Sequence, residues 1–128
     1  MDTLEDIAAL AARFIDAVGA GDVETALACY APEAKIWHNV DGRTQSPSEM
    51  AAVLAAFVQA VPARSYDERR LRLFDGGFVE QHVLRGRTRS GSEFALEACV
   101  VCEVNGGQIT RLDEYFDSAA VAALAKSA

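Results

Sequence analysis

The chain has 128 residues, 51% of them hydrophobic, which predicts a single domain over residues 1–128 with enough apolar side chains for a core. Its formal net charge of −7 argues against sequence-independent binding of nucleic acid, because such binding needs a basic surface. No apolar run reaches the roughly 20 residues that span a bilayer, and the acidic N-terminus lacks the basic start of a secretory signal, so a soluble cytoplasmic protein is expected.

Two helices are predicted at the N-terminus. Apolar residues recur at spacings of three and four along residues 4–18, which indicates a helix with one apolar face. Thr3 can cap the start of this helix, and a glycine-rich turn ending at Gly21 stops it. Asp22 is placed to cap a second, shorter helix, which ends before Pro32.

A strand and a third helix are predicted next. Residues 34–41 alternate with a period of two, so that Ile36 and His38 share one face of the strand. The motif Ser46-Pro47-Ser48-Glu49 joins an N-cap serine, a proline at the first helical position and a glutamate placed for a capping box. It predicts a helix that ends at Pro62.

The remainder of the chain is predicted to form four strands and a short helix. Turn signals occur at Asp75-Gly76-Gly77, Ser90-Gly91 and Asn105-Gly106-Gly107. They separate strands over residues 66–74, 78–87, 93–104 and 108–117, and an alanine-rich helix follows over 118–126. This order of elements predicts an α+β fold in which N-terminal helices pack on a curved, mostly antiparallel sheet with a central pocket.

The last two strands are predicted to place a carboxylate on the inward face. The first of them has an apolar row that consists of Phe94, Leu96, Ala98, Val100 and Cys102. A three-residue turn at Asn105 would set Ala98 opposite Glu114. Glu114 would then lie between Leu112 and Phe116 on the core side of the sheet.

Glu114 and His38 are the two candidate functional residues, because both are ionisable and both fall on rows otherwise made of core residues. Burial raises the pKa of a carboxyl group and lowers that of an imidazole, which brings both toward neutrality, where proton transfer is most useful. The alternative interpretation is that each residue makes one structural hydrogen bond, since structural networks also perturb pKa values.

The pattern does not decide which face of the strand over residues 78–87 is inward. Apolar residues occur on both of its rows, so either Gln81 with Val83, or His82 with Leu84, can face the core.

The three cysteines, Cys29, Cys99 and Cys102, form an odd set without a disulfide framework. Cys99 and Cys102 fall on a predicted strand, where residues three apart point to opposite faces. Two such thiols cannot easily hold one ion, and the chain has only two histidines, so buried structural cysteines are expected rather than a metal or redox site.

The order of elements and three short motifs resemble the nuclear transport factor 2-like superfamily. The motifs are Ala20-Gly21-Asp22, Tyr30-Ala31-Pro32-Glu33-Ala34 and the ending Ile109-Thr110-Arg111-Leu112-Asp113-Glu114-Tyr115-Phe116-Asp117, which is similar to the last strand of SnoaL-like members. The resemblance covers nearly the whole chain and implies a cone-shaped, cystatin-like fold with a pocket. The superfamily includes ketosteroid isomerases, limonene epoxide hydrolases, scytalone dehydratase, polyketide cyclases and non-catalytic binding domains, so it implies a pocket but no single reaction.

Matched residue by residue, the resemblance implies roles for five positions. His38 matches the proton-abstracting aspartate of the isomerases and a water-holding asparagine of the epoxide hydrolases, and Glu114 matches an acid aspartate of the hydrolases. Gln81 and Val83 match the arginine and second aspartate of the hydrolases, which favours the Gln81 row as inward. Phe14 matches the tyrosine oxyanion donor of the isomerases. Three of these positions, Gln81, Val83 and Phe14, carry different chemistry here. Ketosteroid isomerisation and limonene epoxide hydrolysis by the mechanisms of those families are therefore disfavoured.

Two functions remain open. The first is an isomerase, lyase, cyclase or hydrolase that acts on a small apolar molecule without a cofactor. His38 would be the general base, Glu114 the acid or the group that orients the imidazole, and Gln81 a neutral hydrogen-bond donor. The predicted pocket wall consists of Phe14, Ile36, Val83, Leu96, Ala98, Leu112 and Phe116. The second is a non-catalytic ligand-binding or protein-interaction domain of the same fold.

A homodimer is expected under either function. The outer face of the predicted sheet has more apolar side chains than a monomer favours, namely Trp37, Cys99, Val101, Ile109 and Tyr115.

Overall fold

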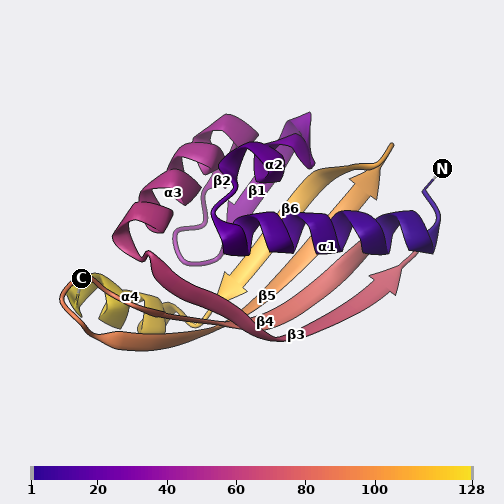
Figure 1. Cartoon of the computed structure of the whole chain (residues 1–128). Coiled ribbons are helices and arrows are strands. Elements are labelled where there is room, and N and C mark those ends of the chain that lie inside the picture. The colour runs from indigo at the N-terminus through magenta and orange to yellow at the C-terminus, as the bar shows by residue number, and fades with distance from the viewer. Residues whose placement is uncertain (1, 128) are drawn as a thin grey trace.

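The structure, a computed structural model, describes residues 2–127 as four helices and six strands (Figure 1). The helices are α1 (Leu4–Ala20), α2 (Val23–Ala28), α3 (Pro47–Ala60) and α4 (Ser118–Ser127). The strands are β1 (Tyr30–His38), β2 (Thr44–Gln45), β3 (Ala63–Phe74), β4 (Gly77–Arg87), β5 (Glu93–Asn105) and β6 (Gln108–Phe116). The predicted α+β class is confirmed.

The strands form an open, mixed sheet in the order β2-β1-β6-β5-β4-β3. β1 runs parallel to β6, and the other neighbouring strands are antiparallel. Figure 1 shows the sheet curving beneath α1, α2 and α3, with α4 near one end of it. The concave face of the sheet is therefore the face that the N-terminal helices cover.

Capping signals in the sequence set where α1 and α3 begin. The Thr3 and Ser46 side chains accept hydrogen bonds from the backbone N–H groups of Asp6 and Glu49. In return, the carboxylates of Asp6 and Glu49 accept from the N–H groups of Thr3 and Ser46, which completes two capping boxes. α1 ends at Ala20 and is capped by Gly21, whose left-handed backbone (φ 75°) favours glycine.

β1 spans Tyr30–His38 in place of the predicted residues 34–41. Its pairing with β6 shifts between Tyr30 and Lys35, so Pro32 lies in an irregular part of the strand that tolerates the loss of a ladder hydrogen bond. After His38, whose carbonyl accepts a hydrogen bond from the Gly42 N–H, the chain turns and the strand ends. His38 is therefore the last residue of β1.

The turn between β5 and β6 is tighter than predicted. Gly106 and Gly107 both have positive φ (61° and 75°) and form a two-residue turn, with Asn105 paired to Gln108. Together with a bulge in β6, this turn pairs Glu114 with Val100 rather than with Ala98. The predicted partner is wrong by two residues, and because side chains alternate with a period of two, Glu114 keeps the predicted face.

The bulge in β6 is an extra residue, Thr110. Glu103 pairs with Arg111, but the next residue, Val104, pairs with Ile109. A bulge reverses the alternation of faces, so Ile109 is completely buried in the core. The prediction that Ile109 lies on the outer face is therefore wrong.

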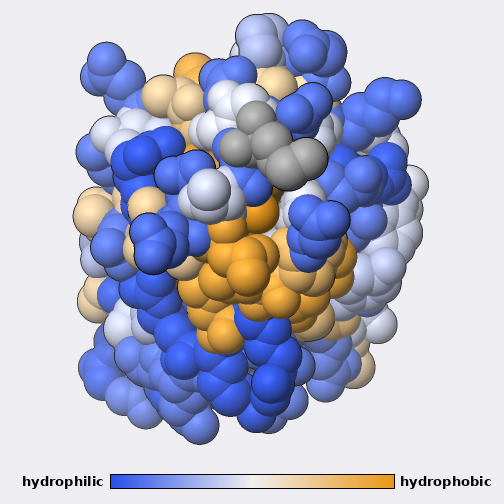
Figure 2. Space-filling model, turned by 90° about the vertical axis from the view of Figure 1, so that its right-hand side faces the viewer, coloured by the Kyte–Doolittle hydropathy of each residue, from blue (hydrophilic) through white to orange (hydrophobic). Residues whose placement is uncertain are grey.

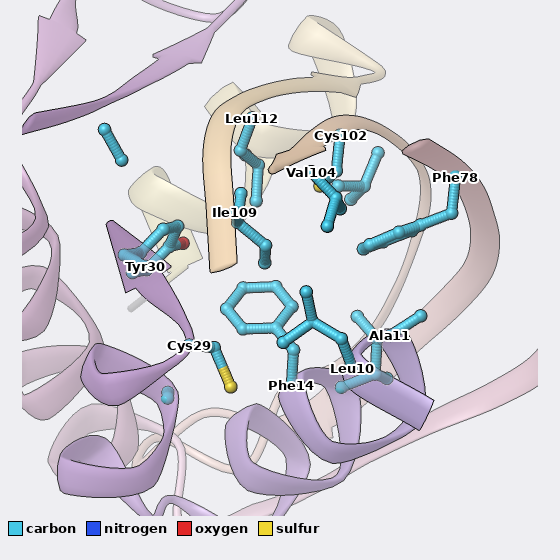
Figure 3. Packing of buried hydrophobic residues seen from close by; sticks show 14 of the residues in the cluster. Leu10, Ala11, Phe14, Cys29, Tyr30, Phe78, Cys102, Val104, Ile109 and Leu112 are labelled. Carbon is cyan, nitrogen blue, oxygen red and sulfur yellow. The ribbon is translucent and has the colours of Figure 1, made fainter. Parts of the chain in front are cut away.

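The hydrophobic core lies between α1 and the sheet. Figure 3 shows Leu10 and Phe14 of α1 pointing toward Ile109 of β6, with Phe78 of β4 beside them. Burial of each such side chain contributes about 1.5–3 kcal/mol relative to exposure. These contacts hold α1 over the sheet and so fix one wall of the space between them.

An apolar patch lies on the end of the molecule that carries the N-terminus. Figure 2 shows this end face-on, with apolar side chains gathered at its centre. α1 and β3 reach this end (Figure 1), and the exposed large apolar residues of these two elements are Leu4, Leu71, Leu73 and Phe74. None of these four residues lines the cavity described below.

The cysteines are free thiols, with Cys29 and Cys102 buried. Burial raises the pKa of the Cys102 thiol well above its ordinary value, which keeps it protonated and unreactive. Residues 2–127 contain no cluster of three or more metal-binding side chains. Within the same residues, no helix has the length and apolar character needed to cross a membrane.

Candidate functional site

A cavity of about 500 Å³ lies between the helices and the concave face of the sheet. Apolar side chains dominate its lining, for example Met50 and Leu54 of α3 and Leu112 of β6. Val121 and Leu124 of α4 also contribute. The volume and the lining are typical of sites for small organic molecules.

His38 and Glu114 meet on the wall of this cavity. They are direct partners across β1 and β6, and Nε2 of His38 lies 3.0 Å from Oε1 of Glu114. The side chains are only 12% and 19% exposed, so water screens their interaction weakly. The structure thus brings together the two residues that the sequence singled out.

The contact with Glu114 favours the charged form of His38. Burial alone would lower the pKa of His38, but the hydrogen bond and the charge of Glu114, with a further contribution from Asp41, outweigh burial and raise it above the ordinary 6.5. This direction is opposite to the one expected from burial in the sequence, because the partner carboxylate is close enough to dominate.

Two phenols also line the cavity. Burial raises the pKa of Tyr30 well above its ordinary value. Burial and the charge of Glu114 raise the pKa of Tyr66 to about 12, although Arg64 opposes the shift. Both residues therefore stay neutral near pH 7 and can act as hydrogen-bond donors. Tyr30 packs edge-on against Phe14 at a centroid distance of 5.3 Å, so a phenol lies beside the position where the resemblance implied one.

Five of the seven predicted wall residues line the cavity: Phe14, Ile36, Leu96, Leu112 and Phe116. The other two, Val83 and Ala98, do not. Ala98 is buried, and with Val83 it lines a second depression, bounded by β3, β4, β5 and β6, which shares His82 and Phe116 with the lining of the cavity.

Gln81 is not part of the His38 site. It pairs with Cys99 of β5 and lines the second depression with Val83 and Glu97. The prediction that the Gln81 row faces inward is wrong, because cross-strand partners share a face and Cys99 alternates with the inward residues Ala98 and Val100. The register with β5 therefore decides the face that the β4 pattern left open.

The inward row of β4 consists of the buried residues Phe78, Glu80, His82 and Leu84. His82 lines the cavity, and its Nδ1 lies 2.8 Å from Oε1 of Glu80. Sequence reasoning kept His82 open and did not consider Glu80. The available signal was the pairing of two ionisable residues at a spacing of two, which places both on one face of a strand.

The sequence profile of the SnoaL-like domain family matches residues 11–112. The chain therefore belongs to the SnoaL-like domain family. Among curated proteins, no sequence relative matches the chain.

Solved structures with the same fold share little sequence with the chain. PrhC from Penicillium brasilianum has a TM-score of 0.86 at 17% identity, covering 98% of this chain and 89% of that one. A candidate polyketide cyclase from Xanthomonas campestris pv. campestris has a TM-score of 0.84 at 18% identity, and the match covers 98% of each chain. A candidate isomerase from Bacillus subtilis has a TM-score of 0.83 at 12% identity, and the match covers 100% of this chain and 98% of that one. At such identities the likeness shows the fold alone.

Proposed function

We propose that the protein is an enzyme that moves a proton on a small, mostly apolar molecule, with His38 and Glu114 as the reacting pair. The observation that supports this most strongly is the 3.0 Å contact between Nε2 of His38 and Oε1 of Glu114 on the wall of an apolar cavity. An imidazole and a carboxylate in contact can divide the roles of base and of orienting or acidic group. The step needs no cofactor.

In the active form, Glu114 accepts a hydrogen bond from Nε2–H of a neutral His38 imidazole. The lone pair on Nδ1 then takes a proton from an acidic C–H of the bound molecule, and the electron pair of that bond moves onto an adjacent carbonyl. The carboxylate stabilises the imidazolium that results. Return of the proton to another atom completes an isomerisation, and departure of a leaving group completes an elimination.

The names of two solved structures with the same fold, a candidate polyketide cyclase and a candidate isomerase, are in line with this chemistry. The alternative is a domain that binds the same kind of molecule without turnover. The raised pKa of His38 favours this alternative for an acidic ligand, because an imidazolium can pair with an anion.

Hydrogen–deuterium exchange at the acidic C–H of 2-tetralone tests the proposal with a defined probe. Wild-type protein should accelerate exchange in deuterated buffer, and His38→Ala and Glu114→Gln should each slow the protein-dependent rate by about 10²-fold or more. Binding of 2-tetralone without any acceleration of exchange would favour the non-catalytic alternative. Equal rates for the wild type and both variants would refute the role of the pair.

We also propose that the protein forms a homodimer through the outer face of the sheet. Trp37 and Tyr115 pack edge-to-face there with ring centroids 5.3 Å apart, and Tyr115 is 46% exposed. A second copy placed on this face would cover the two rings, as aromatic residues are favoured in the centres of interfaces.

A further inference from the structure

A second chain of polar contacts leads from the surface to the same cavity. Asp16 of α1 lies 2.7 Å from Arg69 of β3, and Nε of Arg69 lies 3.7 Å from Oε2 of Glu80. The other oxygen of Glu80 contacts Nδ1 of His82 at 2.8 Å. Glu80 and His82 have side chains only 3% and 2% exposed, so this is a buried, partnered carboxylate next to a buried imidazole.

An unusual backbone conformation places Arg69 in this chain of contacts. Glu68 has φ 54°, which non-glycine residues rarely adopt, and the register of β3 against β4 shifts between Asp67 and Arg70. The shift reverses the alternation of faces, so Arg69 reaches Glu80 beneath α1 instead of pointing to the outer side. The backbone strain thus serves the buried carboxylate, as strain at functional sites often does.

The contacts of Glu80 set which nitrogen of His82 carries the proton. A carboxylate that faces Arg69 on one side and Nδ1 on the other accepts the Nδ1–H hydrogen bond. Nε2 of His82 is then left with a lone pair, and it is buried without a hydrogen-bond partner in residues 2–127. An unsatisfied buried polar atom destabilises the fold, and a hydrogen-bond donor from a ligand would offset that cost.

His82 and the His38–Glu114 pair lie at separate places on the cavity wall. His82 pairs with Ala98, which pairs with Phe116, two residues beyond Glu114. Two strand spacings and two residues place the backbones of His82 and Glu114 on the order of 10 Å apart. Val100 and Phe116 line the cavity between them, so the two polar places are joined by an apolar surface.

We propose that Nε2 of His82 is a second ligand-binding atom of the cavity, which accepts a hydrogen bond from a hydroxyl group of the ligand. Glu80 and Arg69 are positioning residues that hold the imidazole in the accepting tautomer. The inference rests on the proposed function for the other end of the ligand. It defines the substrate class as an elongated, mostly apolar molecule with a hydroxyl at one end and the reacting C–H near the other. Because Nε2 is buried, the proposal requires the ring of Tyr66, which packs edge-on against His82 at a centroid distance of 5.1 Å, to rotate when the ligand binds.

Long-range ¹H–¹⁵N NMR spectra of the full chain test the tautomer directly, since the chain has only two histidines. We expect a proton on Nδ1 of His82 and a lone pair on Nε2, with a mixture of tautomers in Glu80→Gln. Addition of 2,6-dihydroxynaphthalene should shift the Nε2 signal of His82, whereas naphthalene should not. A proton on Nε2 in the free protein, or an Nε2 signal that the diol leaves unchanged, would overturn the inference.

Binding of the same two probes gives an independent test. The ratio of the affinities for the diol and for naphthalene should fall about tenfold in His82→Phe, while naphthalene still binds and so reports an intact cavity. An unchanged ratio would contradict the inference. Failure of 2-tetralone exchange together with a His82-dependent ratio would refute the proposed function and leave the His82 site standing. Active exchange of 2-tetralone with an unchanged affinity ratio would refute the His82 site and leave the proposed function standing.

Discussion

His38 of β1 and Glu114 of β6 are direct partners across the parallel strand pair, and their side chains meet at 3.0 Å on the cavity wall. Because the hydrogen-bonded ladder fixes both backbones, the separation of the two groups is set by the sheet rather than by a loop. The charge of His38 therefore depends on its contact with Glu114, and this dependence is measurable.

The stability of the fold should depend on pH through His38. Its pKa is raised in the folded state, so the contribution to stability is full below the ordinary value of 6.5 and is lost as pH rises through the folded-state pKa. The difference in free energy of unfolding between the wild type and His38→Gln should thus be larger at about pH 5.5 than at about pH 9. Urea unfolding at both values measures it, and a difference that grows with pH would contradict the assignment.

Removal of the carboxylate should reverse the direction of the His38 shift. In Glu114→Gln the attraction that raises the pKa of His38 is lost and burial dominates, so the pKa should fall below 6.5. NMR titration of the imidazole measures this value. Asp41→Asn is the matched control, because Asp41 makes the smaller contribution and its loss should lower the pKa less. A His38 pKa that stays above 6.5 in Glu114→Gln would show that another group charges the imidazole.

Gly77 should not tolerate a side chain. A Cβ atom there would meet the backbone oxygen of Cys102 and the ring of Phe74. Overpacking of this kind costs about 1–3 kcal/mol, so Gly77→Ala should lower the free energy of unfolding by that amount. Gly19→Ala in α1 is the control, since a Cβ atom there makes only an ordinary 3.4 Å contact with Tyr66. Chemical denaturation of both variants measures the difference, and equal stabilities would contradict the close packing of β4 on β5.

The outer face should carry the dimer contact. Tyr115→Asp should convert a dimer into a monomer in light scattering, because it would bury a charge between two copies. Leu71→Asp makes the same kind of change at an exposed apolar residue of β3, which pairs with the inward residue Glu80, and should leave the dimer intact. A monomeric wild-type protein, or a dimer that only Leu71→Asp disrupts, would refute this interface.

Much of the fold was predictable because its signals are local. The cap predicted at Thr3 and the capping box predicted at Ser46 depend on side chains within four residues, and both are confirmed. The alternation along β1 placed His38 on a core row, and the turn signal at Asn105 placed Glu114 on the inward row of β6. An error of two residues in the β5–β6 register left that face unchanged.

The remainder depended on contacts between distant strands. β4 has apolar residues on both rows, and each row also carries polar residues, such as Glu80 and Gln81, so only the pairing of Gln81 with Cys99 decides the face. A bulge at Thr110 reverses the alternation of faces within β6, and a bulge at Glu68 does so within β3. No local sequence pattern predicted either bulge. The burial of Ile109 and the inward turn of Arg69 follow from these bulges.

A double-mutant cycle on the exchange of 2-tetralone tests the central claim most directly. If His38 and Glu114 act as one unit, the protein-dependent exchange rate of the double variant, His38→Ala with Glu114→Gln, should be no slower than that of the slower single variant. Each single variant should be about 10²-fold or more below the wild type. Single variants that exchange as fast as the wild type, or effects that multiply in the double variant, would contradict a shared proton-transfer role for the pair.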